Sequence, residues 1–288
     1  MRIIEKVTRF VRKPLPDQWA AIKATLDERR RLHRLTGAYA PPKVLRSAEK
    51  MYIAHRPDSD VFYKRYPEIA QLSELWIKNN LIANASDLPR LYALILNIKQ
   101  VLDENIMGDM AELGVYRGNS AAVLAYYARI YHRRVLLFDT FQGFDKRDLV
   151  GVDESKPTEF TDTSLNHVKD LVGDKDVRFV QGRFPQSVPR ELYASQFCLA
   201  HIDCDLYEPA KAGLEFFYPR LSAGGLLIVH DYANPHWDGI KRAVDAYCRE
   251  IPERPLVFGD KSGTVMIRKS AIWDRRGWSE PHFSPRDE

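Results

Sequence analysis

From Met107 onward, short apolar runs alternate with segments of helical pattern, and this alternation restricts the fold more than any other feature of the 288-residue chain. A strand-helix-strand order is typical of a parallel sheet with helices on both faces. The strands are predicted at 109–115, 135–139, 177–181, 197–203, 225–230, 255–259 and 263–268, with helices beginning near Asn119, Asp162, Tyr207 and Asp238. The sequence therefore predicts an α/β fold.

The last two predicted strands are joined by only five residues, Gly259 to Gly263. Parallel strands need a crossover of about a dozen residues or more, so this connection predicts an antiparallel hairpin. We therefore expect a seven-stranded, mostly parallel sheet with an antiparallel terminal strand. This is the Rossmann-like architecture of class I methyltransferases, and the NAD-dependent Rossmann fold is the nearest alternative.

The residues before this region have a different character, helical and irregular, with a loop-rich stretch that contains several prolines. Apolar residues recur at helical spacing from Leu88 to Leu102, which predicts a helix with one buried face. We expect an N-terminal helical cap region over 1–105, an α/β domain over 106–270 and a C-terminal tail over 271–288.

The composition agrees with a globular enzyme, because 45% of the residues are hydrophobic and 28% are charged. A net charge of +4 is weak evidence for a polyanionic partner, and we expect none that is a nucleic acid. Basic residues crowd the N-terminal segment. They form either a solvated face or a peripheral contact with anionic lipid or an acidic partner, and both interpretations stay open. A homo-oligomer is also possible from the sequence.

Cysteine usage and hydropathy together suggest a cytoplasmic protein. The three cysteines, Cys198, Cys204 and Cys248, form no CxxC pair, which fits a reducing compartment and argues against a zinc knuckle or a disulfide scaffold. No apolar run approaches the eighteen or so residues of a membrane span, and the N-terminus lacks the pattern of a signal peptide.

A turn with two glycines joins the first predicted strand to its helix, between Glu112 and Ser120. Gly114 and Gly118 allow a tight turn and close approach of the backbone to a ligand, and Asn119 or Ser120 can cap the helix. The glycines are four apart, unlike GxGxxG, which weakens a dinucleotide interpretation. Glu112 would repel a pyrophosphate and favours a cationic cofactor such as the sulfonium of S-adenosylmethionine. A plain strand-to-helix turn remains the alternative.

The next two strand ends extend this picture toward an adenosine-containing cofactor. Asp139 ends the second predicted strand and can accept hydrogen bonds from ribose hydroxyls. After the third strand, Gly182 allows close approach to an adenine, and Phe184 either stacks on it or packs in the core. The polar segment from Gly143 to Thr161 is expected to be a mobile lid beside this site, and a disordered segment without function is the alternative.

The fourth and fifth predicted strands both end at acidic residues, where an apolar strand gains nothing from a charge. Ligands bind at the carboxyl ends of strands in open α/β sheets, so Asp203, His230 and Asp231 predict a cation or acid-base site. Carboxylate oxygens suit Mg²⁺, which would acidify a bound hydroxyl. Asp205 either caps the next helix or acts as a base, and His201 is expected to be a satisfied core histidine.

In order and spacing, the stretch from about Glu112 to Lys269 resembles the macrocin O-methyltransferase (TylF-type) family of S-adenosylmethionine-dependent sugar O-methyltransferases. The matching motifs are Glu112-Leu113-Gly114-Val115-Tyr116-Arg117-Gly118, Asp139-Thr140-Phe141-Gln142-Gly143-Phe144, His201-Ile202-Asp203-Cys204-Asp205-Leu206-Tyr207-Glu208, Phe217-Tyr218-Pro219-Arg220-Leu221-Ser222-Ala223-Gly224-Gly225 and His230-Asp231-Tyr232. They cover over half of the chain, which is far more specific than any single motif.

The resemblance implies Mg²⁺ held by an acid after the fourth strand, here Asp203, and by two consecutive acids after the fifth, of which Asp231 is the second. His230 stands where the first of that pair is expected. Imidazole suits Zn, Fe or Ni better than Mg. The alternatives are weaker Mg²⁺ binding, another divalent metal, or His230 as a general base without metal. The expected cofactor-binding residues are Glu112, Gly114, Tyr116, Gly118, Ser120, Asp139, Thr140, Gly143, Gly182 and Phe184.

We therefore expect a metal-assisted, S-adenosylmethionine-dependent O-methyltransferase, with 106–270 as the cofactor-binding domain. Its acceptor would be a small sugar-containing molecule, a glycosylated natural product or a polysaccharide. The expected metal ligands are Asp203, Asp231 and His230, and the expected base is His230 or Asp205. The alternatives are an NAD-dependent sugar-modifying oxidoreductase or epimerase, which the missing GxGxxG disfavours, and a non-catalytic binding protein with the same fold.

Overall fold

The computed structural model of the chain describes residues 64–80 and 87–270. All of them belong to the second of two units into which the chain divides, Arg56–Glu288. Most of the predicted cap region, its basic N-terminal segment and the whole predicted tail lie outside the described residues, so the predicted domain bounds stay predictions. No helix in the described part of the chain is long and apolar enough to cross a membrane.

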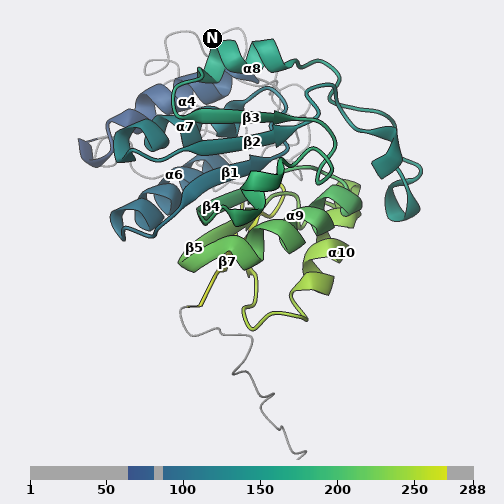
Figure 1. The fold of residues 1–288 in the computed structure, drawn as a ribbon. Coiled ribbons are helices and arrows are strands. Elements are labelled where there is room, and N and C mark those ends of the chain that lie inside the picture. The colour runs from purple at the N-terminus through teal and green to yellow at the C-terminus, as the bar shows by residue number, and fades with distance from the viewer. Residues whose placement is uncertain (1–63, 81–86, 271–288) are drawn as a thin grey trace, which may run out of the picture. The chain divides into compact units, whose positions relative to one another are not determined.

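A single sheet organises the described residues. Its strands are β1 (Asp109–Leu113), β2 (Val135–Asp139), β3 (Val177–Gln181), β4 (Phe197–Ile202), β5 (Leu221–Val229), β6 (Leu256–Val257) and β7 (Val265–Arg268). They lie in the order β3-β2-β1-β4-β5-β7-β6 (Figure 1). The first five strands are parallel to one another, and β7 runs antiparallel to both β5 and β6. The predicted class I methyltransferase architecture is confirmed.

Helices cover both faces of the sheet (Figure 1). On one face lie α4 (Glu68–Asn79), α6 (Leu88–Asp103), α7 (Asn119–Tyr131) and α8 (Leu165–Val172), and on the other lie α9 (Tyr207–Arg220) and α10 (Asp238–Tyr247). Side chains alternate between the two cores along each strand. On β2, for example, Leu137 packs under α6 and α7, whereas Leu136 and Phe138 pack under α9.

The predicted helix over 88–102 is observed as α6, whose apolar face is completely buried in the same core as α4 and α7. Pro89 lies in its first turn, where a missing N–H costs no hydrogen bond. This helix packs against β4 and β5, and its first turn reaches the acidic strand ends described below.

Two predicted bounds differ from the structure for a local reason. The helix expected to begin near Asp162 begins at Leu165, because the Ser164 side chain caps it by accepting from the His167 N–H at 3.1 Å. Strand β5 begins at Leu221, four residues earlier than predicted, and its pairing with β4 shifts register. The register shift lies around Gly224, whose φ is 79°. Because the strand is irregular there, its first residues lack the regular apolar alternation from which a strand is predicted.

The segment expected to be a mobile lid is tied to the rest of the fold through η2 (Lys146–Asp148) and η3 (Gly151–Asp153). Asp148 accepts two hydrogen bonds from Arg183, at 2.9 and 2.6 Å. Asp153 accepts from the backbone N–H of Tyr207 at 2.7 Å. Because both aspartates are buried and bonded, the segment is an anchored part of the scaffold rather than a polar loop.

Candidate cofactor and metal site

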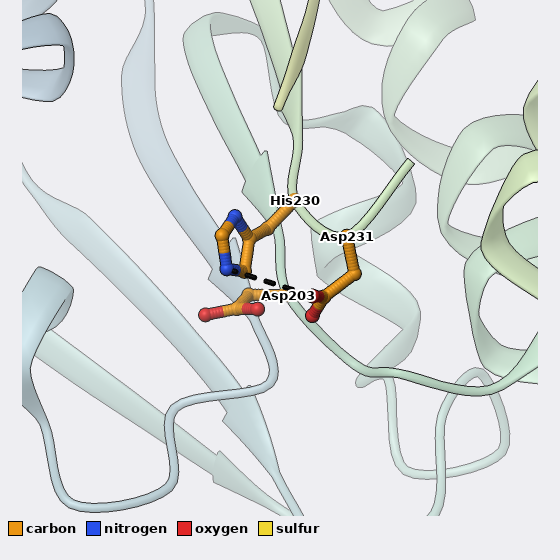
Figure 2. Close-up of side chains that lie close together, drawn as sticks. All are labelled: Asp203, His230 and Asp231. Atoms are coloured by element: carbon orange, nitrogen blue, oxygen red, sulfur yellow. Dashed lines mark ion pairs between the residues drawn. The ribbon is translucent and has the colours of Figure 1, made fainter. Parts of the chain in front are cut away.

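Three side chains meet at the carboxyl ends of β4 and β5: Asp203, His230 and Asp231 (Figure 2). The strands are adjacent, and Ile202 pairs with Val229, so the residues that follow each strand emerge side by side. One ligand atom from each side chain lies within 4.8 Å of the others. The structure thus brings together all three residues that the sequence predicts as metal ligands.

Asp203 is paired with Arg90, a residue that the sequence analysis missed. The Arg90 guanidinium reaches Asp203 Oδ2 from the first turn of α6 and lies 5.6 Å from the ring centroid of Trp76. The two charged side chains are only 15% and 19% exposed. Burial alone would raise the pKa of Asp203, but the positive charge of the adjacent Arg90 holds it at about 2. Asp203 is therefore ionised throughout the physiological range.

A weak signal for Arg90 is present in the sequence. A cation in the first turn of a helix opposes the helix dipole, which favours acidic residues there. Arg90 follows Asp87-Leu88-Pro89 at such a position, so an arginine there suggests a buried acidic partner. The identity of that partner, 113 residues away, has no local signature.

His230 is buried and uses its two ring nitrogens differently. Its Nδ1 lies 2.9 Å from the hydroxyl of Thr264, while Nε2 faces the carboxylates and lies 3.8 Å from Asp231 Oδ1 (Figure 2). Burial, together with the charge of Arg90, lowers the pKa of His230 well below its usual value. The imidazole is therefore neutral at physiological pH and carries one proton.

Asp231 and Asp205 complete an acidic cluster with Asp203. Asp231 accepts a hydrogen bond from Asn234 Nδ2 at 2.8 Å. Burial raises the pKa of Asp231, and repulsion from Asp203 raises it further. Burial and the charges of Asp231 and Asp203 also raise the pKa of Asp205 well above its usual range. The two carboxyl groups, Asp205 and Asp231, therefore compete for a proton.

The alternative in which Asp205 caps the following helix is wrong. The N-cap position of α9 is occupied by Leu206 and not by Asp205. The Leu206 side chain makes no capping hydrogen bond. Asp153 accepts the Tyr207 N–H instead, from 54 residues earlier in the chain. This assignment leaves Asp205 in the acidic cluster, where it was the second candidate base.

The donor set of this cluster fits a divalent cation. Asp203 and Asp231 offer carboxylate oxygens, and His230 offers a nitrogen that faces them. An imidazole nitrogen favours Zn, Fe or Ni, whereas an all-oxygen set favours Mg²⁺. Arg90 already places one positive charge on Asp203, so a metal ion would have to share that carboxylate or displace the guanidinium.

Asp139, the predicted ribose ligand, holds the turn that follows β1. Its Oδ2 accepts from the backbone N–H groups of Val115 and Tyr116 at 2.6 and 3.0 Å, and its Oδ1 accepts from Phe141 at 2.6 Å. Burial raises the pKa of Asp139, and these bonds oppose that effect. A ribose would therefore share a carboxylate that already orders two loops.

A cleft of about 450 Å³ opens beside these loops, at the ends of β2 and β3. Its lining includes Phe141, Gln142, Thr163 and Gln181. Thr163 donates a hydrogen bond to the backbone carbonyl of Tyr116, so the cleft adjoins the turn after β1. An adenosine group at this place would lie next to Asp139, as the sequence predicts.

Glu112 is completely buried and is bonded to the predicted core histidine, His201. The distance from His201 Nδ1 to Glu112 Oε1 is 2.8 Å, which confirms His201 as a satisfied core residue. Burial raises the pKa of Glu112, and the bonds from His201 and Ser120 oppose this. Its second oxygen, Oε2, has no hydrogen-bond partner of normal geometry among the described residues. A buried carboxylate oxygen of this kind is suited to a cationic ligand.

Gly114 is required by the fold itself. Its φ is 86°, and a Cβ on it would lie 2.0 Å from the backbone oxygen of Asp203. The turn after β1 therefore lies directly against the acidic cluster. Gly118 is the N-cap of α7, and no described side chain caps that helix, so the predicted cap by Asn119 or Ser120 is wrong. The free N–H groups of the first turn remain available for a carboxylate.

The remaining predicted cofactor residues are held by contacts within the chain. The Tyr116 hydroxyl donates to Asp162 Oδ1 at 2.7 Å, and the Thr140 hydroxyl donates to the Gly143 carbonyl at 2.5 Å. A Cβ on Gly182 would lie 2.8 Å from the Cβ of Ser187. These positions shape the loops around the cleft.

Phe184 does not lie in the cleft. Its ring is buried under α9 and stacks on Phe217, with the centroids 5.8 Å apart and an interplanar angle of 17°. Phe138 and Phe216 pack against its edges. The packing interpretation is therefore correct, and the prediction that Phe184 stacks on an adenine is not supported.

Comparison with known proteins agrees with this geometry. A family model described as macrocin-O-methyltransferase (TylF) matches residues 86–266, which is more than half of the chain. The chain is 31% identical over 160 residues to the 8-demethyl-8-(2,3-dimethoxy-alpha-L-rhamnosyl)-tetracenomycin-C 4'-O-methyltransferase of Streptomyces olivaceus, covering 51% of this chain and 61% of that protein. It is 29% identical over 191 residues to the mycinamicin III 3''-O-methyltransferase of Micromonospora griseorubida, covering 60% and 73%.

A solved structure, that of the O-methyltransferase NovP, superposes with a TM-score of 0.55 and 26% identity. The superposition covers 63% of this chain and 80% of that one. The chain thus spans less than two thirds of the first curated relative and most of the structural one. Since the family model takes in the turn after β1 and every member of the acidic cluster, the chain belongs to the macrocin-O-methyltransferase (TylF) family.

Proposed function

We propose that this chain is an S-adenosylmethionine-dependent O-methyltransferase that methylates a sugar hydroxyl of a glycosylated natural product. One observation carries the proposal: the turn after β1 lies against the acidic cluster, with Gly114 in contact with the backbone of Asp203. A methyl donor held by that turn would face an acceptor held by the cluster. The sugar acceptor is favoured by the name of the first curated relative, an O-methyltransferase of a rhamnosyl-tetracenomycin.

The proposed cofactor site uses features that the fold leaves unsatisfied. Glu112 Oε2, which is buried and has no hydrogen-bond partner of normal geometry in the described part of the chain, suits the methionine ammonium. The uncapped N-terminus of α7 suits the methionine carboxylate. The adenosine would occupy the cleft beside Asp139.

His230 is the proposed proton acceptor. Methyl transfer to oxygen requires removal of the hydroxyl proton, and Nε2 of a neutral imidazole can take it. Asp203 is a poor candidate, because its carboxylate is already paired with the guanidinium of Arg90. Asp205 is the alternative base, since its pKa is raised by burial and by its acidic neighbours.

Asp203 and Asp231 would hold a divalent cation, and His230 would be its third ligand where Nε2 binds metal in place of a proton. Such a cation, when bound, lowers the pKa of an acceptor hydroxyl. One lone pair cannot bind a metal and a proton together. Metal titration of the wild type and of His230→Gln by calorimetry therefore separates the two roles: equal affinity assigns Nε2 to the proton, and reduced affinity assigns it to the metal.

The proposal is tested in two steps on the full chain. Calorimetry with S-adenosylhomocysteine should give saturable binding that Glu112→Gln weakens, because the substitution removes a buried negative charge without changing shape. Labelled S-adenosylmethionine should then transfer methyl groups to members of a panel of rhamnosylated polyketides and glycosylated macrolides. Folded protein that does not bind S-adenosylhomocysteine would refute the proposal, and binding of NAD in its place would favour the oxidoreductase alternative.

A further inference from the structure

The loop between β6 and β7, read in the sequence only as a hairpin connection, contributes residues to the acidic cluster. In the antiparallel pair, Val229 of β5 lies opposite Val265 of β7. Thr264 precedes Val265, and His230 follows Val229, so the two side chains meet just past the end of the pair. The Thr264 hydroxyl lies 2.9 Å from His230 Nδ1, and both residues are buried.

A third residue, Asp260, fixes the direction of these hydrogen bonds. The Thr264 hydroxyl donates its proton to Asp260 Oδ2. A hydroxyl has one proton, so toward His230 it can act only as an acceptor. It follows that Nδ1 of His230 is the donor, and whenever the ring is neutral this leaves Nε2 with its lone pair.

The loop is also held rigidly against the strand end that carries His230. The N–H of Ala233 donates to the carbonyl oxygens of Ser262 and Gly263 at 3.0 and 3.3 Å. Gly263 has φ of 66°, and a Cβ on it would lie 2.3 Å from the Cβ of Ala233. Asp260 is itself oriented, because its Oδ1 accepts from the Thr264 N–H at 2.9 Å.

We propose that Thr264 and Asp260 are positioning residues that hold His230 with its proton on Nδ1 and present the Nε2 lone pair to Asp203 and Asp231. Their role rests on the proposed function, but the proton position can be measured without any activity. The arrangement supplies the cluster with an acceptor nitrogen at the position where the family resemblance leads us to expect a carboxylate. Such hydrogen bonds to the far nitrogen of a histidine typically orient it and increase its basicity.

The direct test is the nitrogen-15 NMR spectrum of histidine-labelled protein at about pH 8, where the ring is neutral. The signal of His230 is assigned by its loss in His230→Gln. We expect Nδ1 to show the shift of a protonated nitrogen and Nε2 that of an unprotonated one. The opposite pattern in the wild type would overturn the proposal.

Two variants of Thr264 form a matched pair. Thr264→Ser keeps the hydroxyl and should keep the wild-type pattern. Thr264→Val keeps the shape and removes the acceptor, so the preference for the Nδ1 proton should weaken or disappear. If Thr264→Val folds with an unchanged pattern, the hydroxyl does not control the proton and the proposal fails.

Asp260→Asn gives a second, independent test and serves if Thr264→Val does not fold. The loop N–H groups of Ser262 and Thr264 should keep the oxygen of the new amide at the position of Oδ1. The amide NH₂ would then face the Thr264 hydroxyl and donate to it. The hydroxyl would donate to His230 Nδ1, so the ring proton should move to Nε2, and an unmoved proton would contradict the relay.

Activity separates this inference from the proposed function. In Asp260→Asn and Thr264→Val, kcat should fall by about 10–100-fold, as is typical when such supporting bonds are removed. Thr264→Ser keeps the hydroxyl, so its kcat should stay close to that of the wild type. Binding of S-adenosylhomocysteine should be unchanged, because the hydrogen bonds of Thr264 and Asp260 in the described part of the chain go to His230 and within their own loop, and none goes to the turn after β1. A wild type with the expected proton position and no methyl transfer would refute the function and leave the relay intact.

Discussion

Replacement of Arg90 by Met is the sharpest test of the electrostatics of the site. Methionine has a similar length and can keep the contact with Trp76, but it removes the positive charge beside Asp203. The buried carboxylate of Asp203 would then face Asp205 and Asp231 without a counter-charge. We expect a large loss of stability at neutral pH, since breaking a buried ion pair typically costs about 3–5 kcal/mol.

The pH dependence of this loss follows from the pKa of Asp203. Its folded value of about 2 lies below the ordinary 3.8, so the ionised form stabilises the fold. At about 1.4 kcal/mol for each pH unit of difference, the contribution is about 2.5 kcal/mol at neutral pH. It is present above the unfolded pKa and is lost as the pH falls through the folded one, so about half of it should remain at pH ~3.

The assay is urea denaturation of the wild type, Arg90→Met and Arg90→Lys between neutral pH and pH ~3. The lysine variant keeps the charge and should lose less stability, although it cannot form the same planar contacts. The difference between wild type and Arg90→Met should be largest at neutral pH and should shrink in acid. A difference below about 1 kcal/mol at neutral pH, or one that grows in acid, would refute the assigned role of Arg90.

Three further outcomes are expected. Asp153→Ala should lower the free energy of unfolding by about 1 kcal/mol or more, because α9 loses its cap, whereas the exposed Glu154→Ala should change little. Gly114→Ala should give little soluble folded protein, since its Cβ would lie 2.0 Å from the Asp203 oxygen, and normal circular dichroism and thermal stability would contradict this. His230→Asp should raise the affinity for Mg²⁺ relative to Zn²⁺ in calorimetry, and a preference unchanged from wild type would show that this position does not select the metal.

The sheet could be predicted from the sequence because its evidence is local. Each apolar run identifies one strand, and the five residues between the last two runs exclude a parallel crossover. The cluster of Asp203, His230 and Asp231 could be predicted for the same reason, since adjacent parallel strands bring their carboxyl ends together. These inferences needed strand ends and strand order, and no side-chain geometry.

The residues that the sequence analysis missed all act across long separations. Arg90 reaches Asp203 across 113 positions, Asp153 caps a helix 54 positions later, and Thr264 reaches His230 across 34. No local spacing distinguishes these residues from surface arginines, loop aspartates or strand threonines. Phe184 shows the reverse error, because an aromatic beside a predicted cofactor site is equally suited to the core, and only packing decides.

Arg90 and His230 together alter what the acidic cluster can bind. Relative to three facing carboxylates, a histidine at position 230 removes one negative charge, and Arg90 neutralises another at Asp203. A site with less negative charge attracts a divalent cation more weakly. The same substitution places a nitrogen, oriented through Thr264, beside the proposed acceptor position. Histidine at position 230 thus weakens the attraction for a metal ion but provides a proton acceptor. We therefore expect methyl transfer by this chain to depend less on a divalent metal than methyl transfer by a relative with two consecutive acids.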